Sequence, residues 1–108
     1  MTAEDIVIEH DERGSRFVAR VAGGEAYLTY VRLGPRTLDY YSTFVPESLR
    51  GRGIASALVR HALAYAKDRR LKIVPTCPFV AHVVQQDRSF DDLVVVDKSV
   101  EKGRSPTG

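Results

Sequence analysis

The sequence has very little cysteine and no long apolar run. Its single cysteine, Cys77, cannot form a disulfide within the chain, which excludes a disulfide-stabilised small domain and favours a reducing compartment. No apolar stretch approaches the roughly 20 residues that span a bilayer. The first ten residues carry acidic side chains where a secretory signal carries basic ones. We therefore expect a cytoplasmic protein without a membrane partner.

A strong net charge is also lacking. The 16 Lys and Arg residues against 14 Asp and Glu residues leave a formal net charge of +2. This is too small to indicate bulk nucleic-acid binding, so we expect no nucleic-acid partner and only local basic sites. His10 and His61 have no partner at metal-ligand spacing, and no metal site is predicted.

What the chain does contain is typical of one globular domain. It has 108 residues, 44% of them hydrophobic and 28% charged. We expect residues 1–97 to form a single domain and residues 98–108 to form a disordered tail.

The first half of the chain predicts strands. β-branched, aromatic and alternating apolar residues mark four stretches, which are separated by short turns such as Gly23-Gly24. The predicted strands are Asp5–His10, Arg16–Val21, Ala26–Leu33 and Thr37–Val45. Consecutive strands joined by short turns form an antiparallel meander.

From Gly53 onward the apolar spacing changes to that of an amphipathic helix ending near Ala66. A fifth strand at Leu71–Val74 follows this helix and is therefore expected to lie parallel to its neighbour. Pro78–Gln86 predicts a second helix with proline at its first position. Leu93–Val96 is interpreted as a last strand, although short apolar runs also occur in other structures. The predicted fold class is α/β (α+β), a mixed sheet with two helices.

The junction between the fourth strand and the first helix carries two arginines and two glycines, Arg50, Gly51, Arg52 and Gly53. Glycines permit unusual backbone angles and close approach, and a helix start presents unpaired N–H groups with a positive dipole end. This predicts a phosphate or pyrophosphate site. The alternative is a tight turn flanked by solvated arginines. No Gly-Lys-Ser/Thr follows, which disfavours nucleotide hydrolysis, and Ser56 replaces the third glycine of a dinucleotide fingerprint.

The segment Arg50-Gly51-Arg52-Gly53-Ile54-Ala55 resembles the acetyl-CoA-binding signature R/Q-x-x-G-x-G/A of the GNAT superfamily of N-acetyltransferases. A second motif, "PTCPFV", follows the fifth strand and is similar to the short YjdJ-type GNAT-like subgroup. The resemblance spans roughly residues 5 to 95 and implies a compact GNAT-like mixed sheet.

The resemblance implies that acetyl-CoA binds between splayed fourth and fifth strands. Backbone N–H groups of Arg50 to Ala55 would hold the pyrophosphate, with Phe44 and Val45 along the pantetheine arm. The family transfers the acetyl group directly to an amine. Many members place a tyrosine acid on the helix after the fifth strand, but "PFVAHVVQQ" has none, and His82 at helical spacing is interpreted as a surface residue.

Two residues remain as catalytic candidates. Cys77 lies after the fifth strand, near the expected thioester, and could accept the acetyl group, assist thiolate protonation, form a mixed disulfide with CoA or simply be buried. Tyr41 is a candidate on the fourth strand, where alternation predicts that Tyr40 and Tyr41 face opposite ways, one of them into the core.

The sequence thus predicts an acetyl-CoA-binding protein that transfers acetyl groups to a small-molecule or peptide amine, as a monomer or weak homodimer. One alternative is a non-catalytic acyl-CoA binder or sensor. Another is a small basic interaction or nucleic-acid module, which would bind oligonucleotides in a salt-sensitive way.

Overall fold

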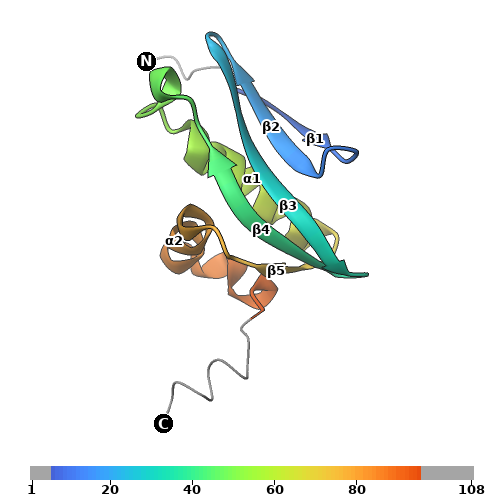
Figure 1. Cartoon of the computed structure of the whole chain (residues 1–108). Coiled ribbons are helices and arrows are strands. Elements are labelled where there is room, and N and C mark those ends of the chain that lie inside the picture. Colours follow the sequence, from blue (N-terminus) through green and yellow to red (C-terminus); the bar gives the residue numbers. More distant parts are fainter. Residues whose placement is uncertain (1–5, 96–108) are drawn as a thin grey trace.

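The computed structural model describes residues 6–95 (Figure 1). Five strands, two α-helices and two short 3-10 helices succeed one another along the chain. They are β1 (Val7–Asp11), β2 (Arg16–Val21), β3 (Gly24–Gly34), β4 (Thr37–Phe44), η1 (Glu47–Leu49), α1 (Ile54–Asp68), β5 (Lys72–Val74), α2 (Pro78–Gln86) and η2 (Arg88–Leu93). The predictions for residues 98–108 and for Asp5 concern residues outside this described part. No helix within residues 6–95 is long and apolar enough to cross a membrane.

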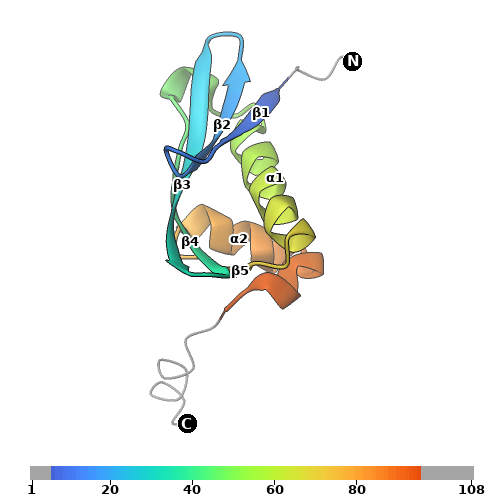
Figure 2. The ribbon, with the colours of Figure 1, turned by 90° about the vertical axis from the view of Figure 1, so that its right-hand side faces the viewer.

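The strands form one sheet in the order β1-β2-β3-β4-β5. The first four are antiparallel neighbours, and β5 pairs in parallel with β4 after the α1 crossover. This confirms the predicted meander followed by a parallel strand, an α+β fold. Both α-helices lie on the same side of the sheet when it is seen edge-on, and no described α-helix covers the opposite face of the sheet (Figure 2).

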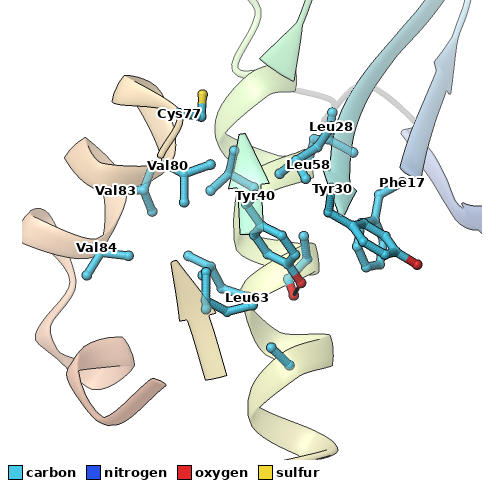
Figure 3. Packing of buried hydrophobic residues seen from close by; sticks show 14 of the residues in the cluster. Phe17, Leu28, Tyr30, Tyr40, Leu58, Leu63, Cys77, Val80, Val83 and Val84 are labelled. Atoms are coloured by element: carbon cyan, nitrogen blue, oxygen red, sulfur yellow. Dashed lines mark hydrogen bonds between the residues drawn. The ribbon is translucent and has the colours of Figure 1, made fainter. Parts of the chain in front are cut away.

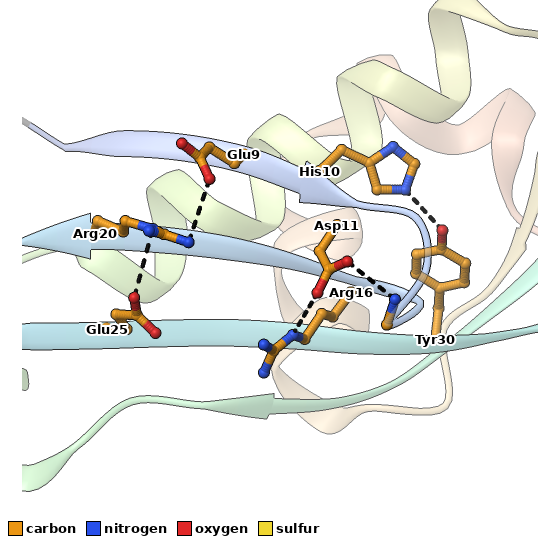
Figure 4. Close-up of polar contacts among 8 residues, drawn as sticks. Glu9, His10, Asp11, Arg16, Arg20, Glu25 and Tyr30 are labelled. Carbon is orange, nitrogen blue, oxygen red and sulfur yellow. Dashed lines mark hydrogen bonds and ion pairs between the residues drawn. The ribbon is translucent and has the colours of Figure 1, made fainter.

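The first two of the three hairpin turns have clear local causes. In the turn between β1 and β2, the Asp11 carboxylate accepts hydrogen bonds from the Gly14 N–H and from Arg16 Nε, at 3.0 and 3.1 Å (Figure 4). A Cβ at Gly14 would lie 2.6 Å from Asp11 Oδ2, so a larger residue there would displace the Asp11 carboxylate. In the next turn, Gly23 and Gly24 adopt positive φ angles of 103° and 148°.

The core lies between the sheet and the two helices (Figure 3). Helix α1 buries one apolar stripe at helical spacing, as its sequence pattern predicts. This stripe consists of Ile54, Leu58, Val59, Ala62, Leu63 and Ala66. The Tyr40 hydroxyl crosses the core and donates a 2.7 Å hydrogen bond to the Ala62 carbonyl, which joins β4 to α1. Burial raises the pKa of Tyr40 well above its ordinary value.

The predicted strand at Leu93–Val96 is wrong over its described residues. Leu93 ends η2, and Val94 makes only an isolated parallel bridge to Ile73. Asp87 explains the difference because its side chain accepts a hydrogen bond from the Ser89 N–H and starts a helical turn. Phe90 and Leu93 then pack into the core at i, i+3 spacing. Val96 lies outside the described residues.

Candidate functional site

A pocket of about 230 Å³ opens at the start of α1. Its walls come from three places in the sequence: the end of β4, the loop that leads into α1, and the first turn of α2. The lining residues are Val45, Leu49, Arg50, Gly51, Gly53, Ile54, Ala55, Ser56 and Phe79. The structure therefore brings most of the predicted cofactor-binding residues together in one place.

The start of α1 leaves its backbone donors available. Gly53 is the N-cap residue, so no side chain caps the helix, and the Ala57 N–H donates a 3.1 Å hydrogen bond to the Gly53 carbonyl. The N–H groups of Ile54, Ala55 and Ser56 precede that bond and have no acceptor within the helix. The first turn also contains no acidic residue. This helix end is therefore suited to bind an anion.

The two glycines shape the loop as the sequence predicts. Gly51 and Gly53 have φ angles of 80° and 76°, in the left-handed region that favours glycine. A Cβ built on either residue would meet no atom within 4 Å. The space in front of these glycines is therefore open, and a ligand can approach the backbone closely.

The arginines add positive charge beside the pocket. Arg50 is exposed and lines the pocket, and its Nε donates a 3.1 Å hydrogen bond to the Val45 carbonyl. Arg52 lies between the two glycines and is exposed. The two arginines of the loop thus add positive charge beside the positive end of the α1 dipole.

Strands β4 and β5 separate on the way to this pocket. Their parallel pairing ends at Asp39 and Val74, whereas β4 continues to Phe44. One further backbone hydrogen bond joins the Cys77 N–H to the Tyr40 carbonyl at 3.0 Å. Beyond it, no described strand pairs with this edge of β4. The exposed edge leads from the end of the β4–β5 pairing to the glycine loop.

A bulge in β4 determines which of its side chains face the space between the separated strands β4 and β5. Thr29 pairs with Ser42 and Tyr30 with Tyr40, so Tyr41 is the extra residue. Beyond the bulge Thr43 pairs with buried Leu28 and therefore faces the core side. There its hydroxyl lies 3.4 Å from Cys77 Sγ.

The remaining predicted residues lie around the pocket rather than in its wall. Phe44 is 45% exposed, and its ring packs against Tyr27 with centroids 5.3 Å apart. Tyr41 is 42% exposed, whereas Tyr40 is fully buried, which confirms that one of the pair belongs to the core. Cys77 is buried at the N-cap of α2, where Figure 3 shows its sulfur at one end of the core cluster.

Three residues that line the pocket were not predicted from the sequence. Leu49 is a buried residue of η1 that packs over the Gly23-Gly24 turn, and Ser56 contributes the third position of α1. Phe79, in the first turn of α2, is half-buried and lines the pocket. The sequence pattern predicts its place in the first turn of this helix, but its position beside the pocket follows from how α2 packs and has no local sequence signal. His82 is exposed, as predicted.

Comparison with known proteins identifies the family. The sequence profile described as GCN5-related N-acetyl-transferase matches residues 16–93. The chain belongs to this family. This confirms the resemblance inferred from the glycine loop.

Relatives and a solved structure agree with this assignment. The chain is 37% identical over 84 residues to Protein NATD1 of Homo sapiens. The aligned part covers 76% of this chain and 74% of that protein. It is 36% identical over 84 residues to Protein NATD1 of Gallus gallus, with 76% of each chain covered. The solution structure of a GCN5-like protein from Staphylococcus aureus superposes with a TM-score of 0.62 at 22% identity, over 88% of this chain and 91% of that one. That similarity supports the fold.

The described part of the chain contains no evident set of metal ligands. Residues 6–95 contain no group of three or more His, Cys, Asp or Glu side chains that could hold a metal ion. The chemistry that the pocket can offer comes from backbone N–H groups, positive charge and apolar walls.

Proposed function

We propose that this protein binds acetyl-CoA in the pocket at the start of α1 and transfers the acetyl group to an amine. One observation carries the proposal: an uncapped helix start, preceded by two glycines with positive φ, opens into a pocket that reaches Val45, the residue after the exposed edge of β4 ends. The first feature suits a pyrophosphate, and the second suits an extended chain that hydrogen-bonds like a strand.

Each part of the pocket has a role in this proposal. The N–H groups of Ile54, Ala55 and Ser56 would donate to the pyrophosphate, and Arg50 would add charge. The apolar side chains of Val45, Leu49 and Phe79 would pack against the pantetheine arm. Because a Cβ at Gly51 or Gly53 would project into open space, glycine at these positions leaves room for the phosphates.

Acetyl transfer requires a neutral amine whose nitrogen bonds to the acetyl carbon as the carbon–sulfur bond breaks, while the proton lost by the amine ends on the CoA thiol. Cys77 and Tyr41 are the candidate groups for that proton. Cys77 is buried beside Thr43 at the inner side of the gap, and Tyr41 lies on the bulge of β4. The acceptor is proposed to be a small-molecule or peptide amine.

A non-catalytic acyl-CoA binder or sensor is the second candidate. Two observations favour it: α2 contains no tyrosine, and only the short turn at residues 12–15 connects β1 to β2, so that within residues 6–95 no α-helix covers the outer face of the sheet. A sensor would keep the CoA pocket and lack turnover.

Release of free CoA thiol separates the two candidates. The full chain is incubated with acetyl-CoA and a panel of amines, and binding is measured separately by calorimetry. Thiol release that depends on the amine is the expected result. Tight binding without turnover for any amine would favour the sensor, and absence of CoA binding would overturn both candidates.

A further inference from the structure

A second cavity, of about 250 Å³, lies at the opposite end of α1 from the glycine loop. Its walls come from the last turn of α1, from the residues that lead into β5, and from η2, which lies against the end of α1 (Figure 2). None of its lining residues lines the pocket at the start of α1. The 15 residues of α1 place its two ends about 22 Å apart, so this cavity is separate from the proposed CoA site.

The charged side chains that line this second cavity are mostly positive, and we call it the cationic cavity. They are Lys67, Arg70 and Lys72, against the single carboxylate of Asp92, and all four residues are exposed. The whole chain has a formal net charge of only +2, so three cations around one hollow are a local excess. Like charges held close together repel, and an anion between them relieves that repulsion. The cationic cavity therefore favours an anionic ligand.

The two lysines are held in place by the backbone of η2. Lys67 Nζ donates a 3.2 Å hydrogen bond to the Ser89 carbonyl and lies 6.0 Å from the centre of the Phe90 ring. Lys72 Nζ donates a 2.7 Å hydrogen bond to the Asp92 carbonyl. Because an ammonium group has three donors, each lysine keeps two more for a ligand. Both charges are thus positioned at the cavity before a ligand binds.

Arg70 occupies a backbone position that usually belongs to glycine. Its φ of 59° lies in the left-handed region, directly after the C-cap residue Arg69. The Leu71 N–H donates a 2.8 Å hydrogen bond to the Ala66 carbonyl. The Arg70 N–H donates a 3.2 Å hydrogen bond to the Lys67 carbonyl, which completes a Schellman motif. Glycine would make the same backbone bonds with less strain, so the helix end itself does not require arginine here.

The Arg70 guanidinium has no partner in the described part of the chain. Among residues 6–95, no carboxylate or carbonyl accepts a hydrogen bond from it and no aromatic ring packs against it. Arg69, by contrast, lies over the Tyr65 ring at 4.8 Å and does not line the cavity. Cations often offset the negative end of a helix dipole, but Lys67 and Arg69 already lie at that end. The five donors of Arg70 are therefore available to a ligand.

We propose that the cationic cavity binds the phosphate group of a small phosphate monoester. Near neutral pH such a group carries close to two negative charges and has three strong acceptor oxygens. Arginine binds phosphate through two parallel hydrogen bonds, and lysine binds it as a point charge. Arg70, Lys67 and Lys72 together therefore match one phosphate group. This site is independent of the proposed acetyl-CoA site.

The size and the apolar wall of the cavity limit the rest of the ligand. Half-buried Leu71 and buried Leu93 provide a surface for the first carbons of the ester. The volume of about 250 Å³ lies below the roughly 300–1,000 Å³ of pockets that enclose a drug-sized ligand. The cavity therefore fits a phosphate with a short organic group and not a whole cofactor.

Binding is tested by titrating the full chain at about pH 7.5 and constant ionic strength, while backbone amide shifts are followed by NMR. The probes are methyl phosphate and methyl sulfate, which has a similar shape but a single charge. We expect saturable shifts at Arg70, Leu71 and Ser89, with an affinity at least about fivefold higher for methyl phosphate, because attraction to the cations grows with ligand charge. Equal affinities, or shifts confined to the start of α1, would overturn the site.

A phosphoserine tripeptide distinguishes a small ligand from a phosphorylated protein. It should bind no more tightly than methyl phosphate, since the cavity has little room beyond the phosphate and its first carbons. Binding that is at least about tenfold tighter would overturn the small-ligand assignment, because it would require contacts outside the cavity.

Two adjacent arginines provide matched variants. Arg70→Gln should weaken methyl phosphate binding at least about tenfold, since a hydrogen bond between charged groups is lost. Arg69→Gln removes the same charge one residue earlier, outside the cavity, and should change the affinity less than about threefold. Equal losses would show diffuse attraction to a basic surface and would overturn the site. Asp92→Asn should bind about two- to fivefold more tightly, because it removes the one carboxylate of the lining.

Arg70→Gly separates ligand binding from folding. It should lose methyl phosphate binding as Arg70→Gln does, while its urea midpoint should equal or exceed that of the original protein, since glycine fits the left-handed backbone. A lower midpoint would show that the Arg70 side chain stabilises the end of α1 and would overturn its assignment to a ligand.

Discussion

At the residue scale, Gly53 offers a direct test of the proposed ligand. Its φ of 76° strains any other residue, but a Cβ there meets no atom within 4 Å. Gly53→Glu should therefore keep the fold while placing a negative charge at the helix start. We expect CoA affinity, measured by calorimetry, to fall at least about a hundredfold, because like charges brought together in a binding site cost several kcal/mol.

The matched control is Gly53→Ala, which introduces the same backbone strain of about 1–2 kcal/mol without the charge. It should lose less than about tenfold in affinity. Equal affinities of the two variants would show that the ligand does not lie at the helix start.

Cys77 is the second residue where a small change is informative. Its sulfur is buried 3.4 Å from the Thr43 hydroxyl, and it is not part of the pocket wall. Cys77→Ala should therefore leave CoA affinity within about twofold but lower amine-dependent thiol release by at least about tenfold, as expected for loss of a proton donor. Unchanged turnover would instead assign Cys77 to packing.

At the scale of single elements, the sequence predicted those whose ends are marked by local chemistry. Helix α2 spans the predicted residues Pro78–Gln86 because proline at the first helical position fixes its start. The prediction of a strand at Leu93–Val96 was wrong because four consecutive apolar residues do not distinguish a strand from a helical turn. The Asp87 side chain, outside that run, decided the outcome.

The side-chain hydrogen bond that joins β4 to α1 gives a prediction at the scale of single elements. Tyr40→Phe removes the buried 2.7 Å hydrogen bond to the Ala62 carbonyl and should lower the free energy of unfolding by about 1 kcal/mol. Urea titration should show a lower midpoint with an unchanged slope. Tyr41→Phe, at an exposed position, should stay within about 0.5 kcal/mol of the original protein. A similar loss in both variants would contradict the importance of this bond.

At the scale of the whole molecule, the candidate site depends on contacts that the sequence does not encode locally. Two glycines with flanking arginines predicted the loop because their backbone requirements are local. Phe79 lines the same pocket only because α2 packs beside β4, and the bulge at Tyr41 has no sequence signature. The cationic cavity likewise exists only because η2 lies against the end of α1.

The pH dependence of folding also belongs to the whole molecule, because His10 joins β1 to three other elements. Its ring stacks on Phe17 with centroids 4.3 Å apart, lies edge-on to Tyr65 at 4.5 Å, and makes a 2.7 Å hydrogen bond with the Tyr30 hydroxyl (Figure 4). Burial, aided by the charge of Arg69 and opposed by Glu12, holds the pKa of His10 below its ordinary value of 6.5.

In the unfolded chain, by contrast, His10 takes up a proton near pH 6.5. Below that pH the unfolded state binds more protons than the folded state, so the free energy of unfolding falls until the pH reaches the folded pKa. Urea midpoints from about pH 8 to about pH 5 should therefore be flat at first and then decline. His10→Phe keeps an aromatic ring but cannot titrate, so its midpoints, although lower throughout, should lose this decline. His82→Gln, at an exposed histidine, should retain it, and a decline that persists in His10→Phe would assign the effect to other groups.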